Sequence, residues 1–157
     1  MIKVIVKEPH QLCEVREIEN NLKTLQGIVG GYIESIRVNG VTDDDEITCY
    51  GNDEAKLFNL PSNFALVANG YATDCVAGTV VFLGHDGEGG NRGLTNKELE
   101  IVAERVNYLM DIRNKYYGKV IDWSEHIFAE VYNDENEMIK DMIAKGRWKK
   151  LRKEDIR

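Results

Sequence analysis

Asp74-Cys-Val-Ala-Gly-Thr-Val-Val-Phe-Leu-Gly84 is the segment that decides the fold. Apolar residues occupy both parities of this segment, which is typical of a β-strand that is covered on both faces. We therefore predict that residues 74–84 form the central strand of a sheet. Other elements must then pack on each face of that strand.

Alternating segments on the N-terminal side of this strand predict the rest of the sheet. Residues 2–6 and 13–18 alternate in polarity on either side of a proline-containing turn, which favours a β-hairpin. Residues 32–38 and 47–50 return to the same period and are joined by an acidic loop, which indicates two more antiparallel strands. Together with residues 74–84, they predict a mainly antiparallel sheet of about four to six strands.

A short helix is predicted between these two pairs of strands. Apolar residues over 21–29 recur at helical spacing, and Asn20 or Asn21 is suited to cap the N-terminus. The Gly30-Gly31 pair then provides the stop. We expect a short amphipathic helix that packs on the sheet.

A longer helix follows residues 74–84, and its start is the clearest local pattern in the chain. Thr95 and Glu98 have the spacing of a capping box, in which the hydroxyl accepts from one amide and the carboxylate from the other. Residues 96–116 then carry an apolar stripe at helical spacing and end near Gly118. We expect this stripe to lie on the sheet.

The remaining segments complete the predicted domain organisation. Residues 53–60 fit one helical turn. Residues 63–68 fit neither the spacing of a helix nor the alternation of a strand. Apolar residues over 135–145 again recur at helical spacing. The predicted fold class is therefore α+β, with a mainly antiparallel sheet and two helices in a core domain over residues 1–118. A C-terminal helical extension with a basic tail is expected over residues 119–157.

Composition predicts a soluble protein of the cytoplasm. The chain has 157 residues, of which 43% are hydrophobic and 30% charged, and these values are typical of one globular domain. No apolar run is long enough to cross a bilayer, and the alternating start does not resemble a signal peptide. We expect no membrane contact. Three isolated cysteines are expected to be reduced, partly buried thiols without zinc: Cys13, Cys49 and Cys75.

Charge divides the chain into an acidic body and a basic tail. The last thirteen residues, 145–157, contain seven basic and two acidic groups, a balance of +5. Because the whole chain has a net charge of -7, the first 144 residues carry -12. Such a body repels nucleic acid, whereas the tail is suited to an acidic partner, RNA, DNA or a second copy of the chain.

A glycine-rich loop at residues 84–93 is the predicted ligand site. It follows the expected central strand and leads into a helix N-terminus, where free amides and the helix dipole favour an anion such as a nucleotide phosphate. The loop lacks the spacing of known phosphate-binding motifs, so a flexible connection is the alternative interpretation. The candidate anion-binding residues are Gly84, His85, Gly87, Gly89, Gly90, Arg92 and Thr95.

The same loop offers a weaker metal hypothesis. His85, Asp86 and Glu88 could ligate a divalent cation, but a loop so rich in glycine is poorly preorganised for one. No nucleophile and base stand together in a known catalytic pattern. We therefore predict no catalytic residue, no bound metal and no cofactor, and keep a small metal-dependent or nucleotide-modifying enzyme as the alternative.

Two charged segments are candidates for partner contacts. One is the acidic loop, and the other lies in the tail, where an aromatic residue stands among cations. That second pattern suits either docking on the acidic body or nucleic-acid binding, and we favour docking or a protein contact. The residues are Asp43, Asp44, Asp45, Glu46, Arg147, Trp148, Lys149 and Lys150.

Several segments together resemble a known family. They are Met1-Ile-Lys-Val-Ile-Val-Lys-Glu-Pro9, Glu14-Val-Arg-Glu-Ile-Glu19, Leu25-Gln-Gly-Ile-Val-Gly-Gly-Tyr-Ile-Glu34, Asn52-Asp-Glu-Ala-Lys56, Leu60-Pro-Ser-Asn63 and Gly78-Thr-Val-Val-Phe-Leu-Gly-His-Asp-Gly-Glu-Gly89. Their order and spacing over about residues 1–102 resemble small domains of unknown function carried by phages, plasmids and conjugative elements of Gram-positive bacteria. The resemblance implies a setting in which proteins often act on a host, including its defences.

These observations lead to a functional expectation. We expect a non-enzymatic binding protein, located in the host cytoplasm, that inhibits a host defence protein or sequesters a small nucleotide signal. The other partners that the sequence leaves open are a second copy of the chain and nucleic acid bound through the tail.

Overall fold

The computed structural model describes residues 1–43, 46–68 and 71–117. Predictions that concern residues 118–157, including the helical extension and the basic tail, lie outside this part of the chain. None of the helices within it is both long and apolar enough to span a membrane.

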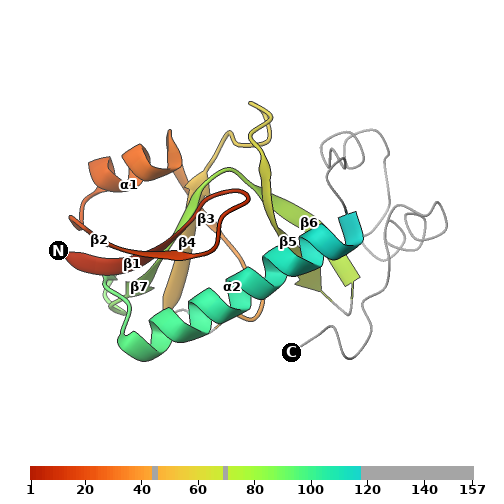
Figure 1. Cartoon of the computed structure of the whole chain (residues 1–157). Coiled ribbons are helices and arrows are strands. Elements are labelled where there is room, and N and C mark those ends of the chain that lie inside the picture. Colours follow the sequence, from red (N-terminus) through yellow and green to blue (C-terminus); the bar gives the residue numbers. More distant parts are fainter. Residues whose placement is uncertain (44–45, 69–70, 118–157) are drawn as a thin grey trace.

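An antiparallel sheet forms the centre of the described structure. Its strand order is β2-β1-β7-β4-β3, and β8 pairs with the end of β7. Figure 1 shows α1 and α2 on opposite faces of this sheet. The α+β fold class is thus confirmed. The strands are β1 (Ile2–Lys7), β2 (Glu14–Ile18), β3 (Ile33–Ile36), β4 (Ile47–Asn52), β7 (Val80–His85) and β8 (Asn91–Arg92).

The predicted central strand over residues 74–84 is in fact two strands. β7 is central and paired on both sides, as expected, but residues 74–77 belong to β6 (Tyr71–Ala77). β6 pairs with β5 (Ser62–Ala68) in a separate two-stranded sheet. Gly78, at a φ of 77°, lets the chain turn between them. Apolar residues on both parities cannot distinguish one long strand from two strands joined by a tight turn.

α1 (Leu22–Val29) covers one face of the sheet, and both of its predicted caps are confirmed. The side chain of Asn21 accepts a hydrogen bond from the Thr24 amide at 2.8 Å, and Gly30 ends the helix in the left-handed conformation. The helix buries Leu25 and Val29 against a cluster from β1, β2 and β7. That cluster contains Val4, Val6, Ile18, Val81 and Leu83.

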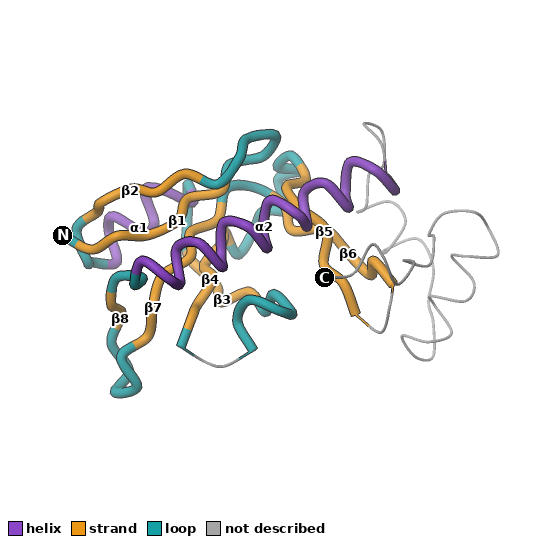
Figure 2. The backbone as a smooth tube through the Cα atoms, turned by 60° about the horizontal axis from the view of Figure 1, so that its bottom comes forward, coloured by secondary structure: helices purple, strands orange, loops and turns teal. Residues whose placement is uncertain are grey.

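α2 (Asn96–Tyr117) covers the other face together with the second sheet, and it begins at the predicted capping box. Figure 2 shows it running from the β7–β8 end of the main sheet to the β5–β6 pair. Alternate residues of β7 therefore pack in two different hydrophobic clusters, one on each face of the sheet. Phe82 packs on the α2 side and Val81 on the α1 side. Phe64 of β5 and Phe82 join the two sheets, with ring centroids 6.2 Å apart.

Candidate functional site

The glycine-rich loop is a compact hairpin between β7 and β8. The Asp86 carboxylate accepts hydrogen bonds from the amides of Glu88 at 2.8 Å and Gly90 at 2.9 Å, and these bonds lower the pKa of Asp86. Nδ1 of His85 accepts from the Gly87 amide at 3.1 Å. The amides of two candidate anion-binding residues, Gly87 and Gly90, thus already have acceptors within the loop.

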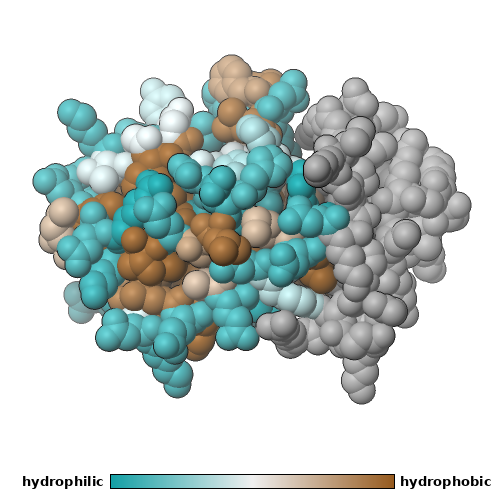
Figure 3. Space-filling model, in the orientation of Figure 1, coloured by the Kyte–Doolittle hydropathy of each residue, from teal (hydrophilic) through white to brown (hydrophobic). Residues whose placement is uncertain are grey.

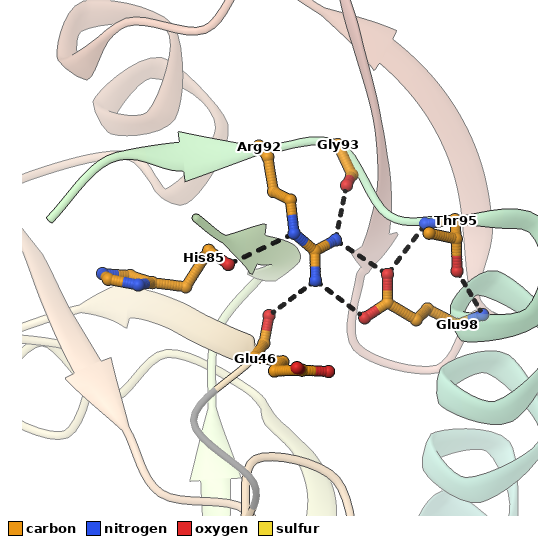
Figure 4. A network of polar contacts seen from close by, with 6 residues as sticks. All are labelled: Glu46, His85, Arg92, Gly93, Thr95 and Glu98. Carbon is orange, nitrogen blue, oxygen red and sulfur yellow. Dashed lines mark hydrogen bonds and ion pairs between the residues drawn. The ribbon is translucent and has the colours of Figure 1, made fainter. Parts of the chain in front are cut away.

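Arg92, the cation expected to pair with that anion, is also fully engaged (Figure 4). Its guanidinium forms two hydrogen bonds with Glu98, at 2.8 and 3.1 Å, and three with main-chain carbonyls. These five bonds account for all five N–H groups of an arginine side chain. Anion binding by this loop remains a prediction, and an anion would have to displace these internal bonds.

Glu98 connects the hairpin to α2. Its carboxylate accepts from the Thr95 amide at 2.9 Å, and its own amide donates to the Thr95 hydroxyl at 3.2 Å, so the predicted capping box is confirmed. The hydrogen bonds from Arg92, followed by those from Thr95, lower the pKa of Glu98 to about 2. The site residues Arg92 and Thr95 therefore anchor the start of α2 in this structure.

The structure brings together Asp43, a candidate for partner contacts, and His85, a candidate for anion binding. Asp43 and His85 line one polar depression of about 770 Å³, together with Arg37, Thr48 and Tyr50. Asp43 accepts from the Gly40 amide at 2.8 Å.

The other predicted contact residues are placed as follows. The main-chain carbonyl of Glu46 accepts from the His85 amide at 2.8 Å, so this end of the acidic loop lies beside the glycine-rich hairpin. Asp44, Asp45 and the four tail residues lie outside the described part of the chain. Among the residues that are described, no group of three or more histidine, cysteine, aspartate or glutamate side chains is arranged to hold a metal ion.

A larger groove, of about 1040 Å³, lies at the other end of β7, and sequence reasoning missed it. Four segments line it: the β1–β2 loop, the end of α1 with the residues that lead into β3, the connection from β4 to β5, and the turn before β7. The corresponding residues lie within 8–11, 26–32, 52–61 and 78–79.

Two large aromatic side chains stand exposed on this groove. Tyr32 is 71% exposed and Phe58 is 63% exposed, and the neighbouring Leu57 is 75% exposed. Figure 3 shows hydrophobic atoms at the top of the molecule, over the segment that joins β4 to β5. A group of large exposed apolar residues around a concavity is typical of an interaction site.

The groove is also acidic. Glu8, Asp53 and Glu54 line it, and none of the described residues that line it is a lysine or an arginine. The C-terminal end of α1 borders the groove at residues 26–30, and this end of a helix carries partial negative charge. Charge and shape therefore favour a ligand with cationic groups and apolar surface.

Asn52 fixes the geometry of the groove. It is only 7% exposed, its side-chain amide donates to the Val29 carbonyl at 3.3 Å, and its side-chain oxygen accepts from the Glu54 amide at 2.8 Å. The Asp53 amide donates to the Tyr32 carbonyl at 3.0 Å. A Cβ at Gly31 would lie 2.9 Å from Asn52 Nδ2, so a larger residue here would force the Asn52 side chain to shift. These contacts hold both aromatic segments in a fixed relation.

His10, which also lines the groove, has an uncommon backbone conformation. Its φ is 66°, in the left-handed region that non-glycine residues rarely adopt. It lies in the β1–β2 loop, where the Gln11 amide donates to the Glu8 carbonyl at 3.2 Å. Such strained residues cluster at functional sites. The sequence predicted only a turn here, because a positive φ at histidine has no pattern of its own.

Comparison with known proteins identifies one family. A family model described as a domain of unknown function, DUF3846, matches residues 2–107. This match includes every described strand and the first half of α2. No curated protein and no solved structure is significantly similar to the chain.

Proposed function

This chain belongs to the DUF3846 family of domains of unknown function, and we propose that it is a binding protein without chemistry of its own that captures a partner protein in the acidic groove. The observation that carries this proposal is the exposure of Tyr32 and Phe58 on a groove of about 1040 Å³. Aromatic side chains contribute strongly to protein interfaces because each buries a large apolar area on contact.

The shape of the groove supports a protein partner over a small molecule. Four separate segments of the chain line it, and exposed apolar residues such as Leu57 extend beyond it. A stable protein interface buries about 800 Å² on each partner. A rim of exposed side chains around a groove can supply such an area, whereas a small ligand requires a more enclosed pocket.

The resemblance to proteins of phages, plasmids and conjugative elements supplies the biological part of the proposal. The partner is then a host protein, and a defence protein is the instance that we favour. The net charge of -12 over the first 144 residues supports a partner with a basic surface, since opposite potentials steer association.

The alternative functions have less support from the described residues. Sequestration of a nucleotide by residues 84–93 requires amide and guanidinium donors that Asp86 and Glu98 already occupy. A small enzyme using His85, Asp86 and Glu88 requires side chains that instead stabilise the hairpin, since His85 and Asp86 accept bonds from its amides. Nucleic-acid binding through the tail remains a prediction.

The proposal is tested by removing the apolar rim without altering the core. The double variant Tyr32→Ser/Phe58→Ser is compared with Val15→Ser/Leu22→Ser, which changes two exposed apolar residues outside the groove. Each full-length protein is used to capture partners from a host extract, and the captured protein is then purified for titration. We expect the groove variant to lose at least tenfold in affinity and the control to bind normally. Normal binding by both variants would overturn the proposal, as would capture of only a second copy of the chain.

A further inference from the structure

The chemistry of the groove specifies what should occupy it. Its carboxylates come from Glu8, Asp53 and Glu54, all of them exposed, and the side chains of Tyr32 and Phe58 offer aromatic surface. Lysine and arginine side chains suit such a surface because a long apolar stem carries their charge. Their cations also interact favourably with aromatic rings. A basic segment with one or two apolar anchors therefore fits both properties of the groove.

The chain itself contains such a segment. The tail includes Lys145-Gly-Arg-Trp-Lys-Lys-Leu-Arg-Lys153, in which six cations surround Trp148 and Leu151. Its balance of +5 over residues 145–157 contrasts with the three carboxylates of the groove. Charge and apolar content are thus complementary between the tail and the groove.

The length of chain before the tail is sufficient to reach the groove. α2 ends at Tyr117, so the 27 residues 118–144 precede the tail. A segment of that length can span up to about 90 Å, at roughly 3.3 Å for each extended residue. A domain of this size has a radius of gyration of only about 13 Å. Any point on the surface of the same molecule is therefore within reach.

We propose that the tail of residues 145–157 occupies the groove of its own molecule when no partner is bound, and that a partner must displace it. This inference rests on the proposed function, because it takes the groove as the docking site. Attachment to the same chain gives the tail a high effective concentration, so even a weak contact competes with a partner. A tail that fills the groove about nine-tenths of the time weakens partner binding about tenfold.

Carbodiimide cross-linking of the full-length protein tests the contact directly, because it joins a carboxylate to a lysine amine only where the two touch. We expect cross-links from Glu8, Asp53 or Glu54 to the tail lysines, within one chain. Mixing labelled and unlabelled protein before the reaction identifies any link between two chains. The variant Asp53→Asn/Glu54→Gln should lose these links, whereas Glu17→Gln/Glu100→Gln, which neutralises two exposed carboxylates elsewhere, should retain them.

Three results would overturn this inference: no link between tail and groove, links to Glu17 or Glu100 at equal frequency, or links only between different chains. A second measurement uses Trp148 fluorescence in a Trp123→Phe background. We expect the emission to shift to the red in Asp53→Asn/Glu54→Gln as the indole becomes exposed. An unchanged spectrum would contradict the docking of Trp148.

These results also separate the inference from the proposed function. If Tyr32→Ser/Phe58→Ser abolishes partner capture but no tail cross-link forms, the groove is a docking site and the tail does not fill it. If the cross-links form but capture persists in that variant, the tail docks and the partner binds elsewhere. When both hold, Arg147→Ala/Lys149→Ala/Lys150→Ala should bind the partner about tenfold more tightly than the unaltered chain.

Discussion

The guanidinium of Arg92 and the carboxylate of Glu98 form a bidentate pair, with N–O distances of 2.8 and 3.1 Å, that joins the β7–β8 hairpin to the first turn of α2. The loop that the sequence indicated as a ligand site is held by this pair and by Asp86. The groove at the opposite end of β7 has the exposed apolar surface and charge that a docking site requires.

The pair predicts a loss of stability in acid. The folded pKa of Glu98 is lowered from 4.5 to about 2, so its stabilisation is complete above the unfolded pKa and is lost as the pH falls from about 4.5 to 2. We expect Glu98→Gln to lower the free energy of unfolding by about 1–3 kcal/mol at pH 7. The difference should shrink toward zero by pH 2. Urea unfolding at a series of pH values measures it, and a constant difference would contradict the pairing.

Lys7 predicts a second rise of stability with pH, this time in the alkaline range. Its side chain is fully buried, and this burial lowers its pKa from 10.5 to about 8, although its ammonium donates to Asn63 Oδ1 at 2.7 Å and to the Glu8 carbonyl at 2.8 Å. Between pH 8 and 10.5 the unfolded chain binds the proton that the folded chain has lost, so this group makes folding more favourable as the pH rises. The free energy of unfolding of the unaltered chain should therefore rise relative to that of Lys7→Met over this interval.

Comparison with Lys7→Met is needed because the buried thiols make the protein less stable, not more stable, as the pH rises. Burial raises the pKa of Cys13 to about 11 and that of Cys75 to about 12, so these groups reduce stability in alkali in both proteins. A stability difference between the two proteins that is independent of pH from 8 to 10.5 would show that Lys7 is not desolvated.

Asn52 should contribute to both stability and binding. Asn52→Ala removes the bonds to the Val29 carbonyl and the Glu54 amide, which we expect to cost about 1–3 kcal/mol and to weaken partner capture. Asn39→Ala is a matched control, since that exposed side chain makes one bond, to the Val67 carbonyl, outside the groove. Equal effects of the two variants on partner capture would contradict a role of Asn52 in shaping the groove.

The core contact between the two sheets gives a prediction for the fold itself. Phe82 is fully buried on the central strand and packs with Phe64. Phe82→Ala should lower the free energy of unfolding by about 3–5 kcal/mol, because it removes a large side chain from a close-packed core. Chemical denaturation measures this loss. A loss below about 0.5 kcal/mol, the range of surface substitutions, would contradict the placement of β7 between two cores.

Local patterns predicted most of the fold because they depend on neighbouring residues. The Asn21 cap, the Thr95–Glu98 capping box and the first hairpin each require contacts within a few residues or across one turn. The turn at Gly78 and strand β5 were missed, because their apolar residues pack between two sheets and show no simple alternation.

The groove could not be predicted in the same way. Tyr32 and Phe58 are 26 residues apart and meet around one concavity only because Asn52 joins the end of α1 to the segment after β4. In the sequence, each residue is as consistent with a core position as with an exposed one. Conversely, two of the amides expected to be free in residues 84–93, those of Glu88 and Gly90, are engaged by Asp86, which the sequence suggested as a possible metal ligand.

Hydrogen–deuterium exchange of the full-length protein, alone and with its purified partner, tests the central claim most directly. If the groove is the docking surface, the partner should slow exchange in residues 8–11, 26–32 and 52–61 and leave the β7–β8 hairpin unchanged. Protection confined to residues 84–93 and the neighbouring acidic loop would contradict the account and return the site to the glycine-rich loop.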